Sequence, residues 1–273
     1  MSAEQSVLNQ NAEPDWKNYD DFARGIDTNR LPASNDWRGK TLRMVFEGGE
    51  EMTLRFSADR QRLLWALQGE SGEEVYEEVY EEVRTSPARY FFNIPLQSPG
   101  NACLTLVLNA ESGRVLMVRS TLLPEQEVEK GSRLSQAFRV GQIAEVAPGG
   151  IVPHLTRELL GYRTLNIYSP NHYYEHFYVN TERYAWQNLR GEQFGHGDMD
   201  YATYYKFEDD MYLFTFREKI IPVCSVFFFD FISGRCTGTF LGLDAAGQVR
   251  VTPAGAFIHK MSYNAYPDGV QPL

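Results

Sequence analysis

The carboxyl and phenol side chains of the C-terminal half are of the right types for proton-transfer chemistry. Glu218 closely follows two aromatic residues, Phe214 and Phe216. A carboxyl group among such rings loses hydration, so its pKa rises and it can exchange protons near neutral pH. The hydroxyl of Tyr168 could donate to a developing oxyanion. We therefore expect acid–base chemistry of the lyase, dehydratase or isomerase kind on an aromatic or conjugated substrate, without a cofactor.

Further residues of the same half would complete such a site. The candidate catalytic residues are Glu218, Tyr168 and His196. The candidate substrate-binding residues are Tyr174, His176, Asn166, Phe214, Phe216, Phe227 and Trp186. Two alternatives remain open. The tyrosines fill a core while Glu218 pairs with Arg217 or Lys219, or the same cavity belongs to a carrier that holds its ligand unchanged.

One short motif must be weighed as a metal site. The segment His172-Tyr-Tyr-Glu175-His176 matches the H-x-x-E-H pattern of some zinc proteases. Zinc binding there needs a helix, which brings residues four apart onto one face. The segment follows a hairpin signal, and on a strand the two histidines would lie about 13 Å apart, with the glutamate on the opposite face. We expect a strand and no metal.

Composition and charge limit the binding partners and the cellular compartment that we expect for this protein. A net charge of −10 without a basic cluster disfavours nucleic acid and anionic membranes. Three cysteines are too few for a disulfide framework and suit a reducing compartment. The polar, acidic start of the sequence resembles neither a signal peptide nor a transit peptide, and the longest apolar stretch is too short to span a membrane. We expect a cytoplasmic protein whose partner is a small apolar or aromatic molecule. A second copy of the chain, as a homodimer, is the other candidate partner.

The elements that would position these residues occur twice along the chain. At an offset of about 122 residues, MTLRFSADRQRLLWALQGE (52–70) aligns with YYEHFYVNTERYAWQNLRGE (173–192). CLTLVLNAESGR (103–114) aligns with CSVFFFDFISGR (224–235) and ends in the same turn. Several matches in one order at nearly constant spacing indicate an internal duplication.

Within each copy the pattern is that of β-strands. Apolar residues alternate or run continuously over short segments, with turn signals between them. Closing such strands removes exposed edges and leaves room for one small ligand. We therefore predict an all-β protein of two tandem antiparallel lipocalin-like barrels, over residues 37–147 and 148–273, after an N-terminal arm of residues 1–36 with one short helix at 20–24. The segment 73–83 has helix-like valine spacing at a strand position, and its glutamates are interpreted as a solvated face.

The two copies differ in polarity. The first copy has Phe46, Met52 and Leu96 where the second has Tyr168, Tyr174 and Glu218. Each polar candidate thus has an apolar counterpart. This asymmetry indicates one working site and one structural copy.

The second copy resembles the phenolic acid decarboxylases, a family of lipocalin-like barrels. The resemblance lies in GYRTLNIYSPNHYYEHFYVNTERY (161–184), YLFTFREK (212–219) and FFFDFISGRCTGTF (227–240). It implies that two family tyrosines fall on Tyr168 and Tyr174 and the family glutamate on Glu218, while a third tyrosine is replaced by Asn166. The family arginine would fall in the loop around His196, which has none. Because a guanidinium is the natural clamp for a carboxylate, this departure argues against simple decarboxylation.

The whole chain resembles a second family, named for molybdenum cofactor biosynthesis protein F (MoaF). The double-copy arrangement, the length and the terminal AFIHKM stretch (256–261) carry this resemblance. It implies two calycin-type halves and an association with molybdoenzyme pathways or monoamine-regulated genes, which is a link by family name alone. A third alternative to an enzyme is therefore an accessory protein of a molybdoenzyme- or aromatic-amine-linked pathway that acts through its surface.

Overall fold

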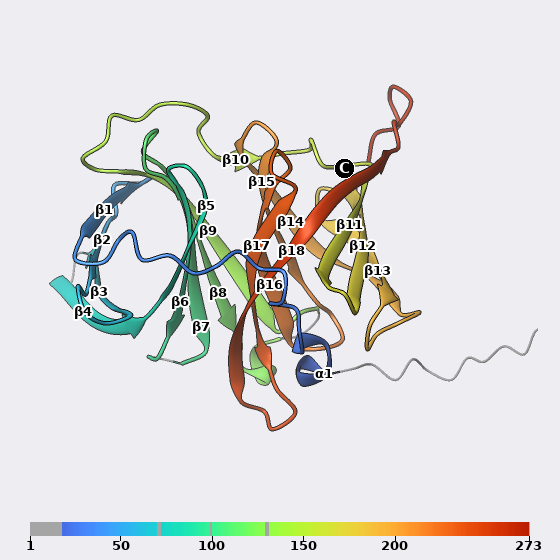
Figure 1. The fold of residues 1–273 in the computed structure, drawn as a ribbon, viewed down its shortest axis with the longest axis horizontal. Coiled ribbons are helices and arrows are strands. Elements are labelled where there is room, and N and C mark those ends of the chain that lie inside the picture. The colour runs from blue at the N-terminus through green and yellow to red at the C-terminus, as the bar shows by residue number, and fades with distance from the viewer. Residues whose placement is uncertain (1–17, 70–71, 99, 129–130, 273) are drawn as a thin grey trace, which may run out of the picture.

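A computed structural model describes residues 18–272 apart from 70, 71, 99, 129 and 130. The part of the predicted arm before residue 18 lies outside the described residues. The prediction of an all-β protein with two tandem barrels is confirmed (Figure 1). No helix in the described ranges is long and apolar enough to cross a membrane.

The first barrel is nearly closed. Its strands are β1 (Thr41–Phe46), β2 (Glu51–Phe56), β3 (Arg62–Gly69), β4 (Gly72–Val79), β5 (Glu81–Ser86), β6 (Arg89–Leu96), β7 (Ala102–Asn109), β8 (Arg114–Leu122) and β9 (Leu134–Ile143). They lie in the order β4-β3-β2-β1-β9-β8-β7-β6-β5. A short 3-10 helix, η1 (Glu125–Glu127), lies between β8 and β9.

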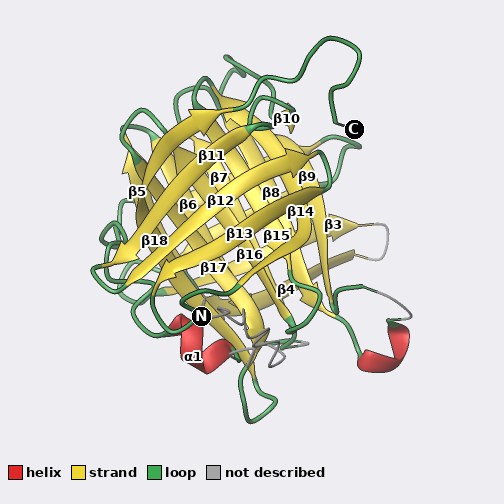
Figure 2. Cartoon of the chain, turned by 90° about the vertical axis from the view of Figure 1, so that its right-hand side faces the viewer, coloured by secondary structure: helices red, strands yellow, loops and turns green. Residues whose placement is uncertain are grey.

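The second barrel is closed. Its strands are β10 (His154–Leu155), β11 (Tyr162–Ser169), β12 (His172–Asn180), β13 (Arg183–Arg190), β14 (Gly197–Glu208), β15 (Met211–Arg217), β16 (Val223–Asp230), β17 (Arg235–Leu243) and β18 (Val249–Tyr263). The order is β10-β14-β13-β12-β11-β18-β17-β16-β15, and pairing of β14 with β15 completes the ring. The strands run obliquely across the view of Figure 2, as closure of a barrel requires.

The strand register supports the duplication residue by residue. Met44 pairs with Met52 in the first barrel, and Asn166 pairs with Tyr174 at the equivalent place in the second. The single long strand β14 corresponds to β4 and β5 together, which are interrupted only at Tyr80.

The segment 73–83, which the sequence left unassigned, therefore belongs to two consecutive strands, β4 and β5, which lie at opposite edges of the first sheet. Its glutamates are not all solvated, since Glu78 and Glu82 are buried. Glu82 accepts hydrogen bonds from the Ser34 hydroxyl and from the backbone N–H groups of Asp36 and Trp37. The interpretation as a solvated face is wrong for these two residues, because they anchor neighbouring backbone.

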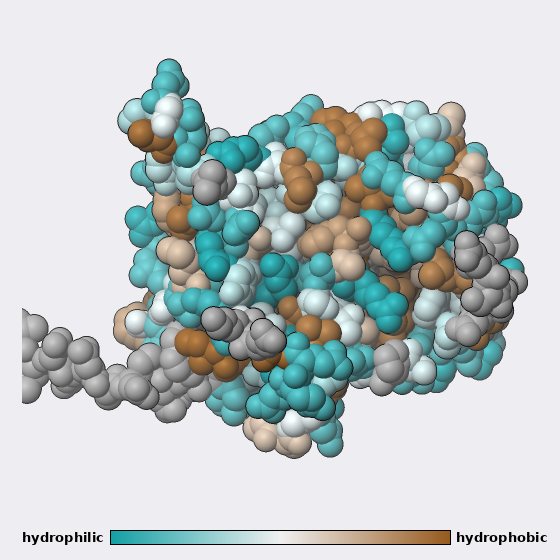
Figure 3. Space-filling model, turned by 180° about the vertical axis from the view of Figure 1, so that it is seen from behind, coloured by the Kyte–Doolittle hydropathy of each residue, from teal (hydrophilic) through white to brown (hydrophobic). Residues whose placement is uncertain are grey.

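The two barrels pack against each other through an apolar interface. Its buried residues are Val83, Phe91, Val107, Leu116 and Val118 of the first barrel, and Phe207, Met211, Leu213, Val226 and Phe228 of the second. At its edge the Arg89 guanidinium pairs with the Glu208 carboxylate at 2.5 Å. On the face in Figure 3, hydrophobic residues occur in small groups among hydrophilic ones.

The N-terminal arm contains the short helix expected near residues 20–24, observed as α1 (Tyr19–Ala23). Asn18 caps this helix, and the Asp21 side chain accepts from the Asn18 backbone in return. The arm does not extend into solvent, because Tyr19, Phe22 and Ile26 are at most 5% exposed. These residues pack into the core of the second barrel, and the chain then crosses to the first barrel (Figure 1).

Candidate functional site

A small cavity lies inside the second barrel, next to α1. Its volume is about 30 Å³, which is enough for one or two water molecules. The residues that line it are Phe22, Ile26, Tyr168, Tyr174, His176, Tyr184, Trp186, Gln193, Phe216, Glu218 and Phe240. Six of the ten residues singled out from the sequence are thus brought together here.

Strand alternation explains how these side chains reach the interior. Because side chains on a strand point to opposite faces in turn, residues two apart share a face. On β12, Tyr174 and His176 therefore both point inward, while Glu175 between them pairs with Arg163 on the outside at 2.6 Å. The H-x-x-E-H segment is part of this strand, so it lacks the helical geometry of a zinc protease.

The Glu218 carboxyl is buried without a partner. It is 8% exposed, and no hydrogen bond or ion pair joins its carboxyl to any described residue. Arg217 instead donates to the Gln136 side chain, and Lys219 pairs with Asp198. The alternative in which Glu218 pairs with a neighbouring cation is therefore wrong. Burial, and then the nearby carboxyls of Asp200 and Asp198, raise the pKa of Glu218 well above its ordinary value of 4.5.

Tyr168 and Tyr174, two of the three tyrosines that line the cavity, are protonated. Burial raises the pKa of the Tyr168 and Tyr174 hydroxyls, so both remain hydrogen-bond donors. The Tyr174 hydroxyl donates to Oε1 of Gln193 at 2.7 Å. No described residue hydrogen-bonds the Tyr168 hydroxyl, which leaves this donor available to a ligand.

His176 is a neutral imidazole. Burial lowers the pKa of His176 from 6.5 to about 3, and its Nδ1 has no hydrogen-bond partner among the described residues. A neutral ring packs well against Tyr184, whose ring centroid is 5.1 Å away. Burial therefore shifts the pKa of each of these cavity groups in the direction that favours its uncharged form.

The lowered pKa of His176 predicts that the folded protein loses stability in acid. A pKa lowered in the folded state means that the unfolded chain binds more protons below about pH 6.5, so stability falls as the pH drops from there toward about 3. We expect His176→Leu, which installs the residue of the first copy, to flatten this part of a stability–pH curve measured by urea denaturation. An unchanged slope would show that His176 is not the group responsible.

Two family descriptions match the chain once this geometry is known. The MoaF N-terminal domain matches residues 14–124 and the MoaF C-terminal domain matches residues 153–264. The chain belongs to the MoaF family. A curated relative, protein MoaF of Klebsiella aerogenes, is 39% identical over 167 residues, which cover 57% of this chain and 63% of that protein. The match thus spans less than two thirds of the relative's own length.

The solved structures compared with this MoaF-family protein resemble it only weakly. A proposed beta-lactamase of Burkholderia vietnamiensis aligns at 14% identity with a TM-score of 0.33, covering 39% of this chain and 100% of that one. The beta chain of DNA polymerase III from Streptococcus pneumoniae aligns at 8% identity with a TM-score of 0.13, covering 88% of this chain and 83% of that one. Both scores are too low to indicate a shared fold.

Asp200 is a buried acid beside the site that the sequence analysis missed. Its carboxylate oxygens accept from Nε1 of Trp186 at 2.9 Å and from the backbone N–H of Lys219 at 3.2 Å. In the first barrel of this MoaF-family chain, Glu78 holds the equivalent place and accepts from the backbone N–H of Gln97 at 3.0 Å. Both barrels therefore have, at this place, a buried acid that accepts a hydrogen bond from a backbone N–H group. The alternation of inward residues along β14 was the signal that could have identified Asp200.

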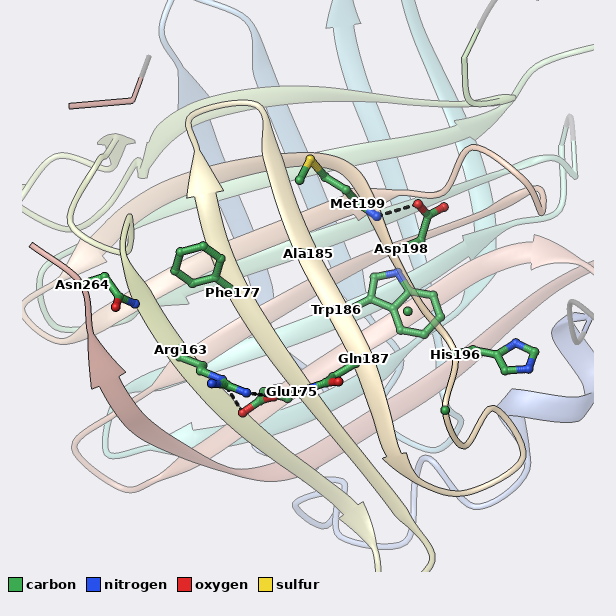
Figure 4. A pocket seen from close by; sticks show the side chains of 12 residues that line it. Arg163, Glu175, Phe177, Ala185, Trp186, Gln187, His196, Asp198, Met199 and Asn264 are labelled. Carbon is green, nitrogen blue, oxygen red and sulfur yellow. Dashed lines mark hydrogen bonds and ion pairs between the residues drawn. The ribbon is translucent and has the colours of Figure 1, made fainter. Parts of the chain in front are cut away.

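Four predicted site residues do not line the cavity. His196 lies in the loop between β13 and β14, beside an outer surface hollow that also includes the Arg163–Glu175 ion pair (Figure 4). Phe214 and Phe227 are fully buried behind the cavity wall. Asn166 is fully buried as well, and its Nδ2 donates to Oγ1 of Thr164 at 3.4 Å.

The cavity also includes residues that the sequence did not single out. Tyr184 and Phe240 come from strands whose inward faces were not worked out, and Gln193 comes from the loop before β14. Phe22 and Ile26 come from the N-terminal arm. No sequence signal relates that arm to the second barrel, because it directly precedes the first.

Proposed function

We propose that the second barrel binds a small uncharged aromatic or conjugated molecule and moves a proton on it. Glu218 is the acid–base group, and Tyr168 donates a hydrogen bond to the oxygen on which negative charge develops. The observation that carries this proposal is the buried Glu218 carboxyl, which no described residue hydrogen-bonds or neutralises.

A structural role does not account for this carboxyl. Burying a polar group without a partner costs about 1–3 kcal/mol in proteins, and buried acids with strongly raised pKa values are concentrated at functional sites. The first barrel places Leu96 at the same position, where it is 3% exposed within the apolar core. The fold therefore tolerates an apolar residue there, and the acid in the second barrel supports a role in chemistry.

The chemistry balances without a cofactor. The Glu218 carboxylate removes a proton from a carbon next to the substrate's carbonyl group, and negative charge develops on the carbonyl oxygen. The resulting carboxyl group then returns the proton to another carbon of the conjugated system. The group ends in its starting state, as an isomerisation requires. A hydrogen bond from Tyr168 to a substrate oxygen would stabilise the intermediate. No arginine or lysine is among the described residues that line the cavity, which favours an uncharged substrate over a carboxylate.

A second candidate is a carrier that binds the same class of ligand without changing it. The mainly aromatic lining of the cavity supports this role equally, because a carrier needs no reactive group. The two candidates differ in what Glu218 does after binding.

Substitution of Glu218 by glutamine tests the enzymatic role. Glu218→Gln keeps the shape of the side chain but removes its acid–base group. Loss of a general acid–base typically lowers the rate by about 10²–10⁴-fold. Turnover of a panel of neutral phenols and enones would be measured, with binding followed by quenching of Trp186 fluorescence. The control is Glu182→Gln, which changes an exposed glutamate of the same barrel. Saturable quenching without product in the unsubstituted protein would support the carrier, and full activity of Glu218→Gln would refute the role of Glu218.

A further inference from the structure

The N-terminal arm forms one wall of the cavity in the second barrel. Phe22 is 5% exposed and Ile26 is 1% exposed, and both line the cavity. The ring of Phe22 packs 5.4 Å from that of Phe240, which belongs to β17. Figures 1 and 2 show α1 at the end of the barrel, outside the ring of strands. The arm is therefore a cover laid over the barrel.

The closed cavity is too small for the proposed ligand. A volume of about 30 Å³ holds water, whereas an apolar cavity that binds benzene measures about 150 Å³. Some part of the wall must move for a ring to enter. The strands are joined around the barrel by continuous backbone hydrogen bonds, so their separation would break a ladder. The arm belongs to no sheet.

Several polar contacts hold the arm on the second barrel. The backbone N–H of Ala245 donates to the Asp20 carboxylate at 2.9 Å, the backbone N–H of Gly255 donates to the Ile26 carbonyl at 3.2 Å, and the Arg235 guanidinium donates to the Asn29 carbonyl at 2.6 Å. The Tyr19 hydroxyl donates to Oγ1 of Thr252 at 2.5 Å. Asn29 donates from its backbone to the Tyr168 carbonyl at 2.9 Å and from Nδ2 to the Ile167 carbonyl at 3.0 Å. These anchors lie outside the cavity. They can be weakened without changing the surface that a ligand would touch.

The far end of the arm is tied to the first barrel. Arg30 pairs with Glu81 at 2.5 Å, and the Ser34 hydroxyl donates to the buried Glu82 carboxylate at 2.7 Å. The segment between α1 and these contacts is thus held at one end by the first barrel and at the other by the second. This arrangement allows α1 to lift while the arm stays attached.

We propose that residues 18–29 are a lid over the second barrel, and that Phe22 and Ile26 contact the ligand and limit its size. The ligand class is an uncharged aromatic molecule, because the lid adds only apolar surface to a cavity without a cation. The inference rests on the proposed function for the location of the site and extends it to ligand entry and selection.

The test compares two kinds of variant with 2-naphthol and phenol as probes. Phe22→Ala and Ile26→Ala remove part of the lid surface, and we expect each to improve binding of 2-naphthol relative to phenol by about 10-fold, the usual effect of matching pocket size. Tyr19→Phe and Asn29→Ala loosen the anchors, and we expect faster association and dissociation with little change in this preference. The control is Val83→Ala, a buried truncation at the barrel interface, which should change neither.

Hydrogen exchange gives a second measurement that needs no activity. Amides of residues 18–29 should exchange faster than those of β11 and β16, and excess 2-naphthol should slow them, because a bound ring holds the lid closed. Equal protection of the arm and these strands would contradict a lid.

Several outcomes would overturn the inference. The arm would be purely structural if two results were found together. These are an unchanged preference for ligand size in Phe22→Ala and Ile26→Ala, and unchanged association and dissociation rates in Tyr19→Phe and Asn29→Ala. Absence of 2-naphthol binding in every variant would lead to the same conclusion. Failure of the proposed chemistry is distinguishable, because Glu218→Gln would then retain turnover while the arm variants still altered binding.

Discussion

Replacing Glu218 by leucine is expected to stabilise the protein by about 1–3 kcal/mol near neutral pH, the usual cost of burying a polar group without a partner. Leucine is the residue of the first copy at this place, where Leu96 is buried in the apolar core. The variant should at the same time lose any proton-transfer activity. A gain in stability with a loss of function is the expected signature of a functional buried acid.

The pH dependence of this effect has a definite sign. Burial raises the folded-state pKa of Glu218 above its ordinary value of 4.5, so the folded chain holds a proton that the unfolded chain releases. Stability attributable to Glu218 is therefore highest below about pH 4.5 and is lost as the pH rises toward the folded-state pKa. The advantage of Glu218→Leu over the unsubstituted protein should grow over that range.

Urea denaturation between pH 4 and pH 9 would measure this difference. Glu218→Gln should also lose the pH dependence, because it lacks the titrating group. The reciprocal variant Leu96→Glu should destabilise the first barrel increasingly with pH. If Glu218→Leu were less stable than the unsubstituted protein at every pH, the carboxyl would have a stabilising partner and the proposed site would be wrong.

Replacing Phe214 by alanine is expected to destabilise the protein by about 3–5 kcal/mol, as truncation of a buried phenylalanine usually does. Phe214 is fully buried. Its ring centroid lies 5.0 Å from that of Tyr184 and 5.3 Å from that of Phe229, so the loss would remove contacts on several sides. The effect is one of packing, since this ring stands behind the cavity wall.

The matched control is Phe92→Ala, which truncates the equivalent fully buried ring of the first barrel. Thermal and urea denaturation should show a loss of similar size. Phe216→Ala, which opens the cavity itself, should change ligand binding more strongly than Phe214→Ala. A small loss of stability with a large change in affinity for Phe214→Ala would instead place this ring in the ligand site, as the sequence predicted.

The second barrel shows how far strand patterns alone define a site. Alternation along β12 correctly places Tyr174 and His176 on one face, because the two-residue period of a strand follows from local backbone geometry. Comparison of the copies identifies Glu218 as the polar exception at an apolar position. Strand patterns do not define how far along the barrel axis an inward side chain lies. Phe214 and Phe216 share a face of β15, yet only Phe216 reaches the cavity.

The duplication, the strand content and the contrast between an apolar and a polar copy follow from the amino-acid sequence by itself, since each depends on spacing and residue type along a single segment. Only the tertiary structure placed His196 outside the barrel, paired Asp200 with Trp186, and laid Phe22 over a cavity formed by strands far along the chain. The physical reason is that these placements depend on contacts between distant segments. Such contacts are set by closure of the barrel and packing of the arm, and no local periodicity encodes them.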